Sequence, residues 1–378
     1  MLELADASLG QRNSDSVDGR SSMNVLIIGN MGYIGPVLVH HLRRAYPHAD
    51  LTGYDAGLFA HCLIGSVPLP ECSLDRQLFG DVRDIPSNLF ERVEAVVNLA
   101  AISNDPMGNH FENATMAINY RAAVDLARKA KLAGVRSYIF ASSCSVYGCA
   151  EEGAKQESSK LDPLTAYARS KVMAEKELIP MADDRFTVTC LRFATACGMS
   201  DRLRLDLVLN DFVAGAIAQK KIVVMSDGSP WRPLINVKDM ARAIEWAITR
   251  GADQGGSGLI VNVGSNEWNC QVKDLANAVA QAIPGVEVSI NTNAPPDRRS
   301  YRVSYDLFKE LAPAFQPLSD LKTTILELKD GLQRAGFQDP AYRESHFMRL
   351  NVIRKFREEG LLNDKLERSF SSKNMSIA

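Results

Sequence analysis

The sequence predicts an α/β protein built on a doubly wound parallel sheet. Short apolar, β-branched runs alternate with helical segments between Asn24 and Val263, as they do in parallel sheets that are covered by helices on both faces. The first of these runs is followed at once by a glycine-rich turn and a helix. The chain has 378 residues, which is enough for one large or two modest domains.

The first unit combines a strand over Asn24–Ile28, the turn Gly29-Asn-Met-Gly32-Tyr-Ile-Gly35, and a helix from Pro36 to Arg44. In such a unit the first glycine permits the tight turn, the second lets a pyrophosphate approach the backbone, and the third lets the helix pack on the strand. The N–H groups and the dipole of the helix N-terminus attract the anion. The unit therefore predicts a dinucleotide site, and the alternative is a tight surface turn.

The second strand, Asp50–Tyr54, ends in Asp55. An acidic residue about 20 positions beyond the glycines binds a ribose diol in dinucleotide-binding folds. No Lys or Arg occurs between Asp55 and Arg76, so nothing nearby neutralises a 2′-phosphate. NAD is favoured over NADP, and the alternative role for Asp55 is that of an ordinary turn residue at a strand end.

Later segments continue the alternation. Asp81, which follows a third short strand, either accepts a hydrogen bond from an adenine amino group or caps the next helix. Asp339 to Leu366 is expected to be an amphipathic helix that packs on the core or forms an oligomer. The other expected strands are Ala95–Ala101, Ser137–Ala141, Thr187–Phe193, Ile222–Met225 and Leu259–Val263, and further helices are expected at about 113–133 and 274–283.

Tyr167 and Lys171 are four residues apart, so they share one face of a helix. A phenol titrates near pH 10, and a neighbouring ammonium is expected to lower that pKa, so that the Tyr can take a proton from an alcohol. The fifth strand ends in the hydroxyl-rich run Ser142-Ser143-Cys144-Ser145, which can bind the same substrate oxygen. The alternative is a solvated Lys beside a half-buried Tyr.

Composition restricts the possible functions. The chain is 46% hydrophobic and 23% charged, with a net charge of −2, and this balance predicts a globular protein without the basic field of a nucleic-acid binder. No apolar run reaches the roughly 20 residues needed to span a bilayer. Residues 1–22 are polar and are expected to be a disordered tail. The seven Cys lack metal-ligand spacing, so we expect no metal site and a reducing, cytoplasmic setting.

Taken together, these motifs resemble the extended short-chain dehydrogenase/reductase family, in its nucleotide-sugar epimerase/dehydratase branch. The resemblance spans about Asn24 to Leu332. The matching stretches are Gly29-x-x-Gly32-x-x-Gly35, Asp55, Gly80-Asp81-Val-Arg-Asp, Asn98-Leu-Ala-Ala101, Ser143-x-x-x-Tyr147-Gly148, Tyr167-x-x-x-Lys171, Leu191-Arg-Phe193 and Arg232-x-x-Ile-Asn-Val-x-Asp239.

The resemblance implies a Rossmann-type NAD-binding domain with a smaller, discontinuous C-terminal lobe that binds a nucleoside-diphosphate sugar. The expected division is a tail over 1–22, the NAD domain over 23–190 with returning segments at about 236–265, the substrate lobe over 191–235 and 266–345, and a C-terminal helix and tail over 346–378. The family also implies a homodimer through the helices at about 113–133 and 167–181.

Roles are implied residue by residue. Tyr167 resembles the catalytic base, Lys171 the residue that holds the nicotinamide ribose and tunes the Tyr, and Ser143 the catalytic hydroxyl. The positions expected to bind the cofactor are Gly29, Met31, Gly32, Tyr33, Ile34, Gly35, Asp55, Asp81, Val82, Leu99, Ala100, Ala101, Tyr167 and Lys171. Those expected to bind the substrate are Ser143, Ser145, Thr195, Arg232, Arg298 and Arg299.

The chain departs from the family at several substrate contacts. Thr195 follows Arg192-Phe193-Ala194 where an Asn is common, Asn236 replaces a His, and Ala294-Pro-Pro-Asp297 precedes Arg298 in place of an Arg-Pro-Gly pattern. These departures leave the nucleotide and the sugar unassigned.

Three activities compete. A 4,6-dehydratase of this family uses an Asp-Glu pair directly after the catalytic hydroxyl, and Cys144 and Ser145 occupy those positions here. A keto-sugar reductase more often uses NADPH, which Asp55 disfavours. An epimerase needs only Ser143, Tyr167, Lys171 and a retained NAD. The expected function is therefore an NAD-dependent epimerase that works through a transient 4-keto sugar, ahead of a reductase or dehydrogenase, a dehydratase, and a catalytically silent NAD-binding protein.

Overall fold

The computed structural model describes residues 23–65, 68–149, 153–294 and 299–369. The expected tail over 1–22 lies outside these residues. A seven-stranded sheet with the order β11-β7-β5-β4-β1-β2-β3 forms the centre of the larger lobe, and every neighbouring pair of its strands is parallel. Its strands are β1 (Asn24–Ile28), β2 (Asp50–Asp55), β3 (Arg76–Phe79), β4 (Ala95–Asn98), β5 (Ser137–Ser143), β7 (Thr187–Phe193) and β11 (Gly258–Val263). The doubly wound fold predicted from the sequence is confirmed.

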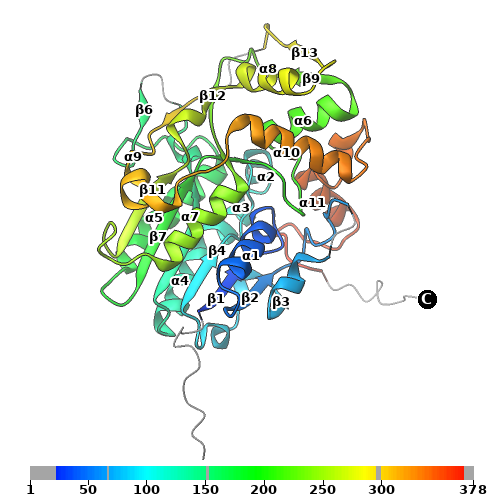
Figure 1. Cartoon of the computed structure of the whole chain (residues 1–378). Coiled ribbons are helices and arrows are strands. Elements are labelled where there is room, and N and C mark those ends of the chain that lie inside the picture. Colours follow the sequence, from blue (N-terminus) through cyan, green and yellow to red (C-terminus); the bar gives the residue numbers. More distant parts are fainter. Residues whose placement is uncertain (1–22, 66–67, 150–152, 295–298, 370–378) are drawn as a thin grey trace, which may run out of the picture.

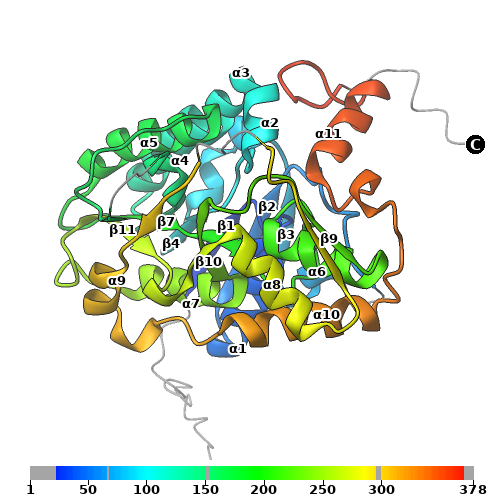
Figure 2. The same ribbon diagram turned by 90° about the horizontal axis from the view of Figure 1, so that it is seen from above.

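Helices cover both faces of this sheet (Figures 1 and 2). In β1, Val25 and Ile27 pack into one apolar core, whereas Leu26 and Ile28 pack into the core on the opposite face. A strand that is buried on both faces is apolar at every position, which is why β1 lacks polar alternation. The covering helices are α1 (Ile34–Ala45) and α7 (Val237–Thr249) on one face, and α4 (Ala123–Leu132) and α5 (Ala166–Leu178) on the other.

The smaller lobe is assembled from separate stretches of chain around its own apolar core. It lies above the sheet in Figure 1. Because β7 continues to Phe193, the large sheet extends past the boundary expected at residue 190. The elements of this lobe are β8 (Thr195–Cys197), β10 (Trp231–Asn236) and β12 (Asn269–Gln271), the pair β9 (Lys221–Val224) and β13 (Glu287–Ile290), and helices α6 (Val208–Ala218), α8 (Val272–Ala282) and α10 (Leu321–Arg334).

Several boundaries differ from the sequence predictions for local reasons. β4 ends at Asn98 rather than Ala101, because the Asn98 side chain accepts a hydrogen bond from the Ala100 N–H and turns the chain. The helix expected over 113–133 is three consecutive pieces, α3 (Glu112–Met116), a π-helical segment over Ala117–Ala122, and α4. Other short elements include α2 (Asp105–His110), α9 (Asp306–Leu311), β6 (Ala154–Lys155) and β14 (Arg302–Val303).

The continuous helix expected over 339–366 is wrong. α11 covers only Arg349–Glu358 and is followed by Gly360, whose positive φ of 71° ends the helix. Ile353 of α11 is fully buried in a cluster with Met107 and Phe111 of the larger lobe. The segment therefore packs on the core, one of the two roles expected for it. No helix among the described residues is long and apolar enough to cross a membrane.

Candidate active site

A cavity of about 870 Å³ lies at the carboxyl ends of the strands, between the sheet and the smaller lobe. Parallel α/β sheets bind ligands at this edge, where the strand order reverses, and here the reversal lies between β1 and β4. The volume is within the usual range for a cofactor site. Of the described residues expected to bind cofactor or substrate, only Met31 and Gly35 do not line the cavity.

The glycine turn after β1 has the shape of a phosphate-binding cradle. A Cβ atom on Gly29, which has a φ of +82°, would lie 2.5 Å from the Ala100 nitrogen, and one on Gly35 would lie 1.8 Å from the Asn30 oxygen. Neither position can hold a side chain. Gly32 is more open, because its nearest contact is 3.3 Å away. The outer two glycines thus serve close packing, and the middle one leaves the backbone accessible to a pyrophosphate.

Asp55 lies at the end of β2 beside this cradle. Its carboxylate accepts hydrogen bonds from the Met31 N–H at 2.9 Å and from the Gly57 N–H at 2.7 Å. Burial raises the pKa of the Asp55 carboxyl, and the two N–H groups counteract part of that rise. Asp55 lines the cavity and Met31 contacts it through its backbone N–H, and the contact of Asp55 with a ribose diol stays a prediction.

Asp81 is engaged by its neighbour Arg83. Both carboxylate oxygens accept from the Arg83 guanidinium, at 2.8 and 2.5 Å, and one also accepts from the Arg83 N–H, so Asp81 caps the short helix that follows. Of the two roles expected for Asp81, helix capping is observed, and the hydrogen bond with adenine stays a prediction.

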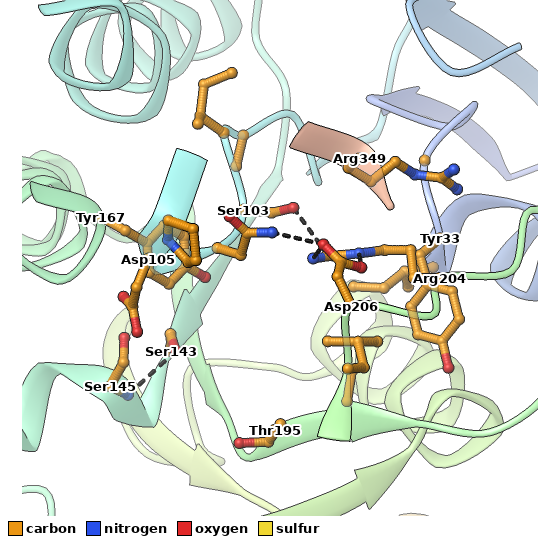
Figure 3. A pocket seen from close by; sticks show the side chains of 18 of the residues that line it. Tyr33, Ser103, Asp105, Ser143, Ser145, Tyr167, Thr195, Arg204, Asp206 and Arg349 are labelled. Carbon is orange, nitrogen blue, oxygen red and sulfur yellow. Dashed lines mark hydrogen bonds and ion pairs between the residues drawn. The ribbon is translucent and has the colours of Figure 1, made fainter. Parts of the chain in front are cut away.

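The three expected catalytic side chains come together at one end of the cavity. α5 begins at Ala166 because the Thr165 hydroxyl accepts the Ala168 N–H, and this start places Tyr167 and Lys171 on one face. The Lys171 ammonium donates to the Ala141 carbonyl at 2.6 Å and lies 5.6 Å from the centre of the Tyr167 ring. Ser143 ends β5 and lies near Tyr167 in Figure 3.

Burial shifts the pKa values of this pair in opposite directions. It raises the pKa of Tyr167 to about 12, although a hydrogen bond with Ser143 and the charge of Arg204 act against the rise. It lowers the pKa of Lys171 from 10.5 to about 7, while the Glu175 charge acts against the fall. The expectation that Lys171 lowers the pKa of Tyr167 below its usual value is therefore wrong for this structure, because desolvation is the larger effect.

The described polar side chains that are expected to bind the substrate line the same cavity, and their contact with a substrate stays a prediction. The buried Ser145 hydroxyl has no hydrogen-bond partner among the described residues and lines the cavity. Thr195 and Arg232 also line it, and Arg299 lies within 2.9 Å of Asp105. Arg298 lies outside the described residues. No group of three or more His, Cys, Asp or Glu side chains in the described part of the chain could hold a metal ion.

The sequence predictions missed a charged pair on the opposite wall. Arg204 binds both oxygens of Asp206 at 2.9 Å and donates to the Ser103 hydroxyl at 2.9 Å, and Figure 3 shows the pair across the pocket from Tyr167. Asn104 donates to the same carboxylate. The sequence did contain a signal for this pair, because charged residues alternate with leucines over 202–206, between β8 and α6.

Comparison with known proteins agrees with this geometry. A model of the NAD dependent epimerase/dehydratase family matches residues 25–264. The chain is 28% identical over 241 residues to an uncharacterised UDP-glucose epimerase, YtcB, from Bacillus subtilis, with 59% of this chain and 71% of that protein covered. It is 27% identical to a UDP-glucose 4-epimerase from Neisseria gonorrhoeae, with 82% of this chain and 95% of that protein covered.

Relatives with another activity are also similar. A dTDP-D-glucose 4,6-dehydratase from Mus musculus is 24% identical, with 76% of this chain and 81% of that protein covered. Among solved structures, MoeE5 in complex with UDP-glucose and NAD has a TM-score of 0.70 at 23% identity, with 82% of this chain and 99% of that chain covered. At such identities the solved structures show a shared fold, and the relatives do not determine one reaction.

Proposed function

Because this chain belongs to the NAD-dependent epimerase/dehydratase family, we propose that it is an epimerase that acts on a nucleoside-diphosphate sugar through a transient 4-keto intermediate. The cofactor is NAD, as predicted from Asp55, and the glycine cradle has the shape that this cofactor requires. Bound NAD supplies a hydride acceptor and donor. The rest of the chemistry belongs to the side chains around Tyr167.

In this proposal Tyr167 removes the proton of the sugar hydroxyl and returns it later in the cycle. Because the pKa of the buried Tyr167 is about 12 in the protein alone, the phenolate needs positive charge nearby when the site is loaded. Lys171 supplies a charge that is only partly present at neutral pH, since its own pKa is about 7. Ser143 holds the substrate oxygen while the proton moves.

The proposal of an epimerase rather than a dehydratase rests on the side chains at the two positions after Ser143. A dehydratase must protonate a departing hydroxyl, which requires an acid at that point. Cys144 is fully buried, its thiol donates to the Arg192 carbonyl, and burial raises its pKa, whereas Ser145 offers only an alcohol. Asp105 and Asp206 are carboxyls near this point. One oxygen of Asp105 is paired with Arg299 at 2.9 Å and the other accepts a hydrogen bond from the Thr165 hydroxyl at 2.7 Å, so both are engaged. The ion pair of Asp206 with Arg204 helps to hold the pKa of Asp206 below the usual range, so Asp206 carries no proton to donate at neutral pH.

The test is an NMR assay of the purified protein against a panel of UDP-, dTDP-, GDP- and CDP-sugars. We expect one sugar to equilibrate with its epimer, without net accumulation of NADH and without loss of water. A 4-keto-6-deoxy product would overturn the proposal in favour of a dehydratase. Stoichiometric NADH formation or consumption would overturn it in favour of a dehydrogenase or reductase, and binding of NAD without turnover of any sugar would point to a silent protein.

A further inference from the structure

Residues Leu361–Ser369, which follow α11, form a well-defined turn that we call the C-terminal loop. Leu362 and Arg368 pair across it in an antiparallel bridge. Inside it the Asn363 side chain accepts hydrogen bonds from the N–H groups of Lys365 at 2.9 Å and Glu367 at 3.0 Å. These internal contacts give the loop a fixed shape, although it lies far along the chain from the glycine turn.

The C-terminal loop is anchored to the segments that follow β2 and β3. These segments contain Asp55 and Asp81 and line the end of the cavity where the adenosine of NAD is expected, which we call the adenosine end. Arg83, which holds the Asp81 carboxylate, donates to the Lys365 carbonyl at 2.7 Å and to the Leu366 carbonyl at 3.3 Å. On the other side, Arg368 donates to the carbonyl of Ala56 at 2.6 Å. Ala56 directly follows Asp55, the residue placed to bind the ribose, so the loop connects the segment after β2 with the segment after β3.

Leu366 is the loop residue that lines the cavity. Its side chain is 3% exposed, and its φ is +57°. A left-handed conformation costs a residue other than glycine about 1–2 kcal/mol, so the surrounding contacts must hold it in place. Leu366 packs in a cluster with Leu58 and Phe59, which also line this end of the cavity together with Val82.

These contacts surround a site with an apolar wall and a carboxylate at its edge, which suits a planar base attached to a ribose diol. We propose that the C-terminal loop forms the outer wall of the adenosine end of the NAD site, and that Leu366 slows release of the cofactor. This role of the loop requires only that the chain binds NAD, so it does not depend on which sugar reaction the chain catalyses.

Because the loop is anchored in this way, it would also affect how long NAD stays bound during turnover. A catalyst that returns the hydride to its own substrate must keep NAD through the whole cycle, because a cofactor lost halfway leaves an oxidised sugar behind. Release of NAD past the loop requires breaking the contacts of Arg83 and Arg368 with it. Retention would then depend on a segment more than 280 residues away from Arg83 in sequence.

The test variant is Leu366→Gly, in the full-length protein. Glycine adopts a positive φ readily, so this change removes the side chain and favours the backbone conformation of the loop. The matched control is Lys220→Gly, because Lys220 also has a positive φ, of 54°, but is exposed between α6 and β9. Dissociation is measured by loading the protein with NADH, mixing it with excess NAD, and following the loss of NADH fluorescence.

We expect NADH to leave Leu366→Gly at least tenfold faster than the parent, which corresponds to about 1.4 kcal/mol of lost binding if association is unchanged. The control should stay within twofold of the parent. Calorimetry with fragments locates the effect: ADP-ribose, which contains the adenosine half, should bind about tenfold more weakly to Leu366→Gly, and nicotinamide mononucleotide should bind as it does to the parent.

Three results would overturn the proposal. They are release rates within twofold of the parent, an equal weakening of both fragments, and tighter binding of ADP-ribose, which would mean that Leu366 occupies the place of the base. If Leu366→Gly does not fold, Arg368→Met replaces it, because Arg368 is exposed and its loss removes only the anchor to Ala56. Release at least threefold faster supports the proposal, and an unchanged rate overturns it.

Discussion

Replacement of Lys171 by Met should make the protein more stable at neutral pH while it removes activity. The Lys171 side chain is fully enclosed, and burial lowers its pKa from 10.5 to about 7. The folded protein therefore releases a proton that the unfolded chain still binds between pH 7 and pH 10.5. Stability rises with pH wherever the unfolded state binds more protons, so the cost of burying Lys171 is complete below pH 7 and disappears as the pH approaches 10.5.

The size of this cost follows from the shift. Each pKa unit corresponds to 1.36 kcal/mol, so the cost is about 4 kcal/mol at pH 7 and about 2 kcal/mol at pH 9. The Met variant loses the hydrogen bond from Lys171 to the Ala141 carbonyl, which is worth about 1 kcal/mol. The expected net gain in the free energy of unfolding is then about 3 kcal/mol at pH 7 and about 1 kcal/mol at pH 9.

The assay is denaturant unfolding of parent and variant at several pH values, on protein freed of NAD so that ligand binding does not contribute. Lys176→Met is the control, because Lys176 is exposed on the same helix, and its effect should not change with pH. A difference between Lys171→Met and the parent that is constant from pH 7 to pH 9, or that grows with pH, would refute the reasoning that burial of the ammonium is costly.

Three further predictions concern chemistry, cofactor choice and assembly. Tyr167→Phe should leave the fold and NAD affinity nearly intact and reduce turnover roughly 10²- to 10⁴-fold, while Ser143→Ala should reduce turnover less and Lys171→Met at least as much. Steady-state kinetics on the sugar found by NMR checks this, and activity of Tyr167→Phe within about threefold of the parent would contradict it. Calorimetry should show tighter binding of NAD than of NADP, with Asp55→Asn narrowing the difference, and a parent that prefers NADP would contradict the role of Asp55. Light scattering should give a homodimer formed through the helical segments at about 113–133 and 167–181, where Met173 is 39% exposed, and a monomer at micromolar concentration would rule this out.

The sequence alone determined those features that depend on neighbours in the chain. The glycine turn could be recognised because its backbone geometry excludes side chains at Gly29 and Gly35. The alignment of Tyr167 with Lys171 follows from helical periodicity, and the parallel sheet follows from strands such as β1 that are apolar at every position. In each case the physical cause acts within a few residues, so a short stretch of sequence contains it.

The tertiary structure alone decided what those residues experience. The sequence placed Lys171 beside Tyr167, but desolvation by the surrounding lobes sets both pKa values and reverses the shift expected for the Tyr. The position of Arg204 and Asp206 opposite Tyr167, and the contact of Arg83 with the C-terminal loop, join segments that are distant in sequence. Burial and long-range pairing depend on how the whole chain packs, and no local pattern of residues specifies them.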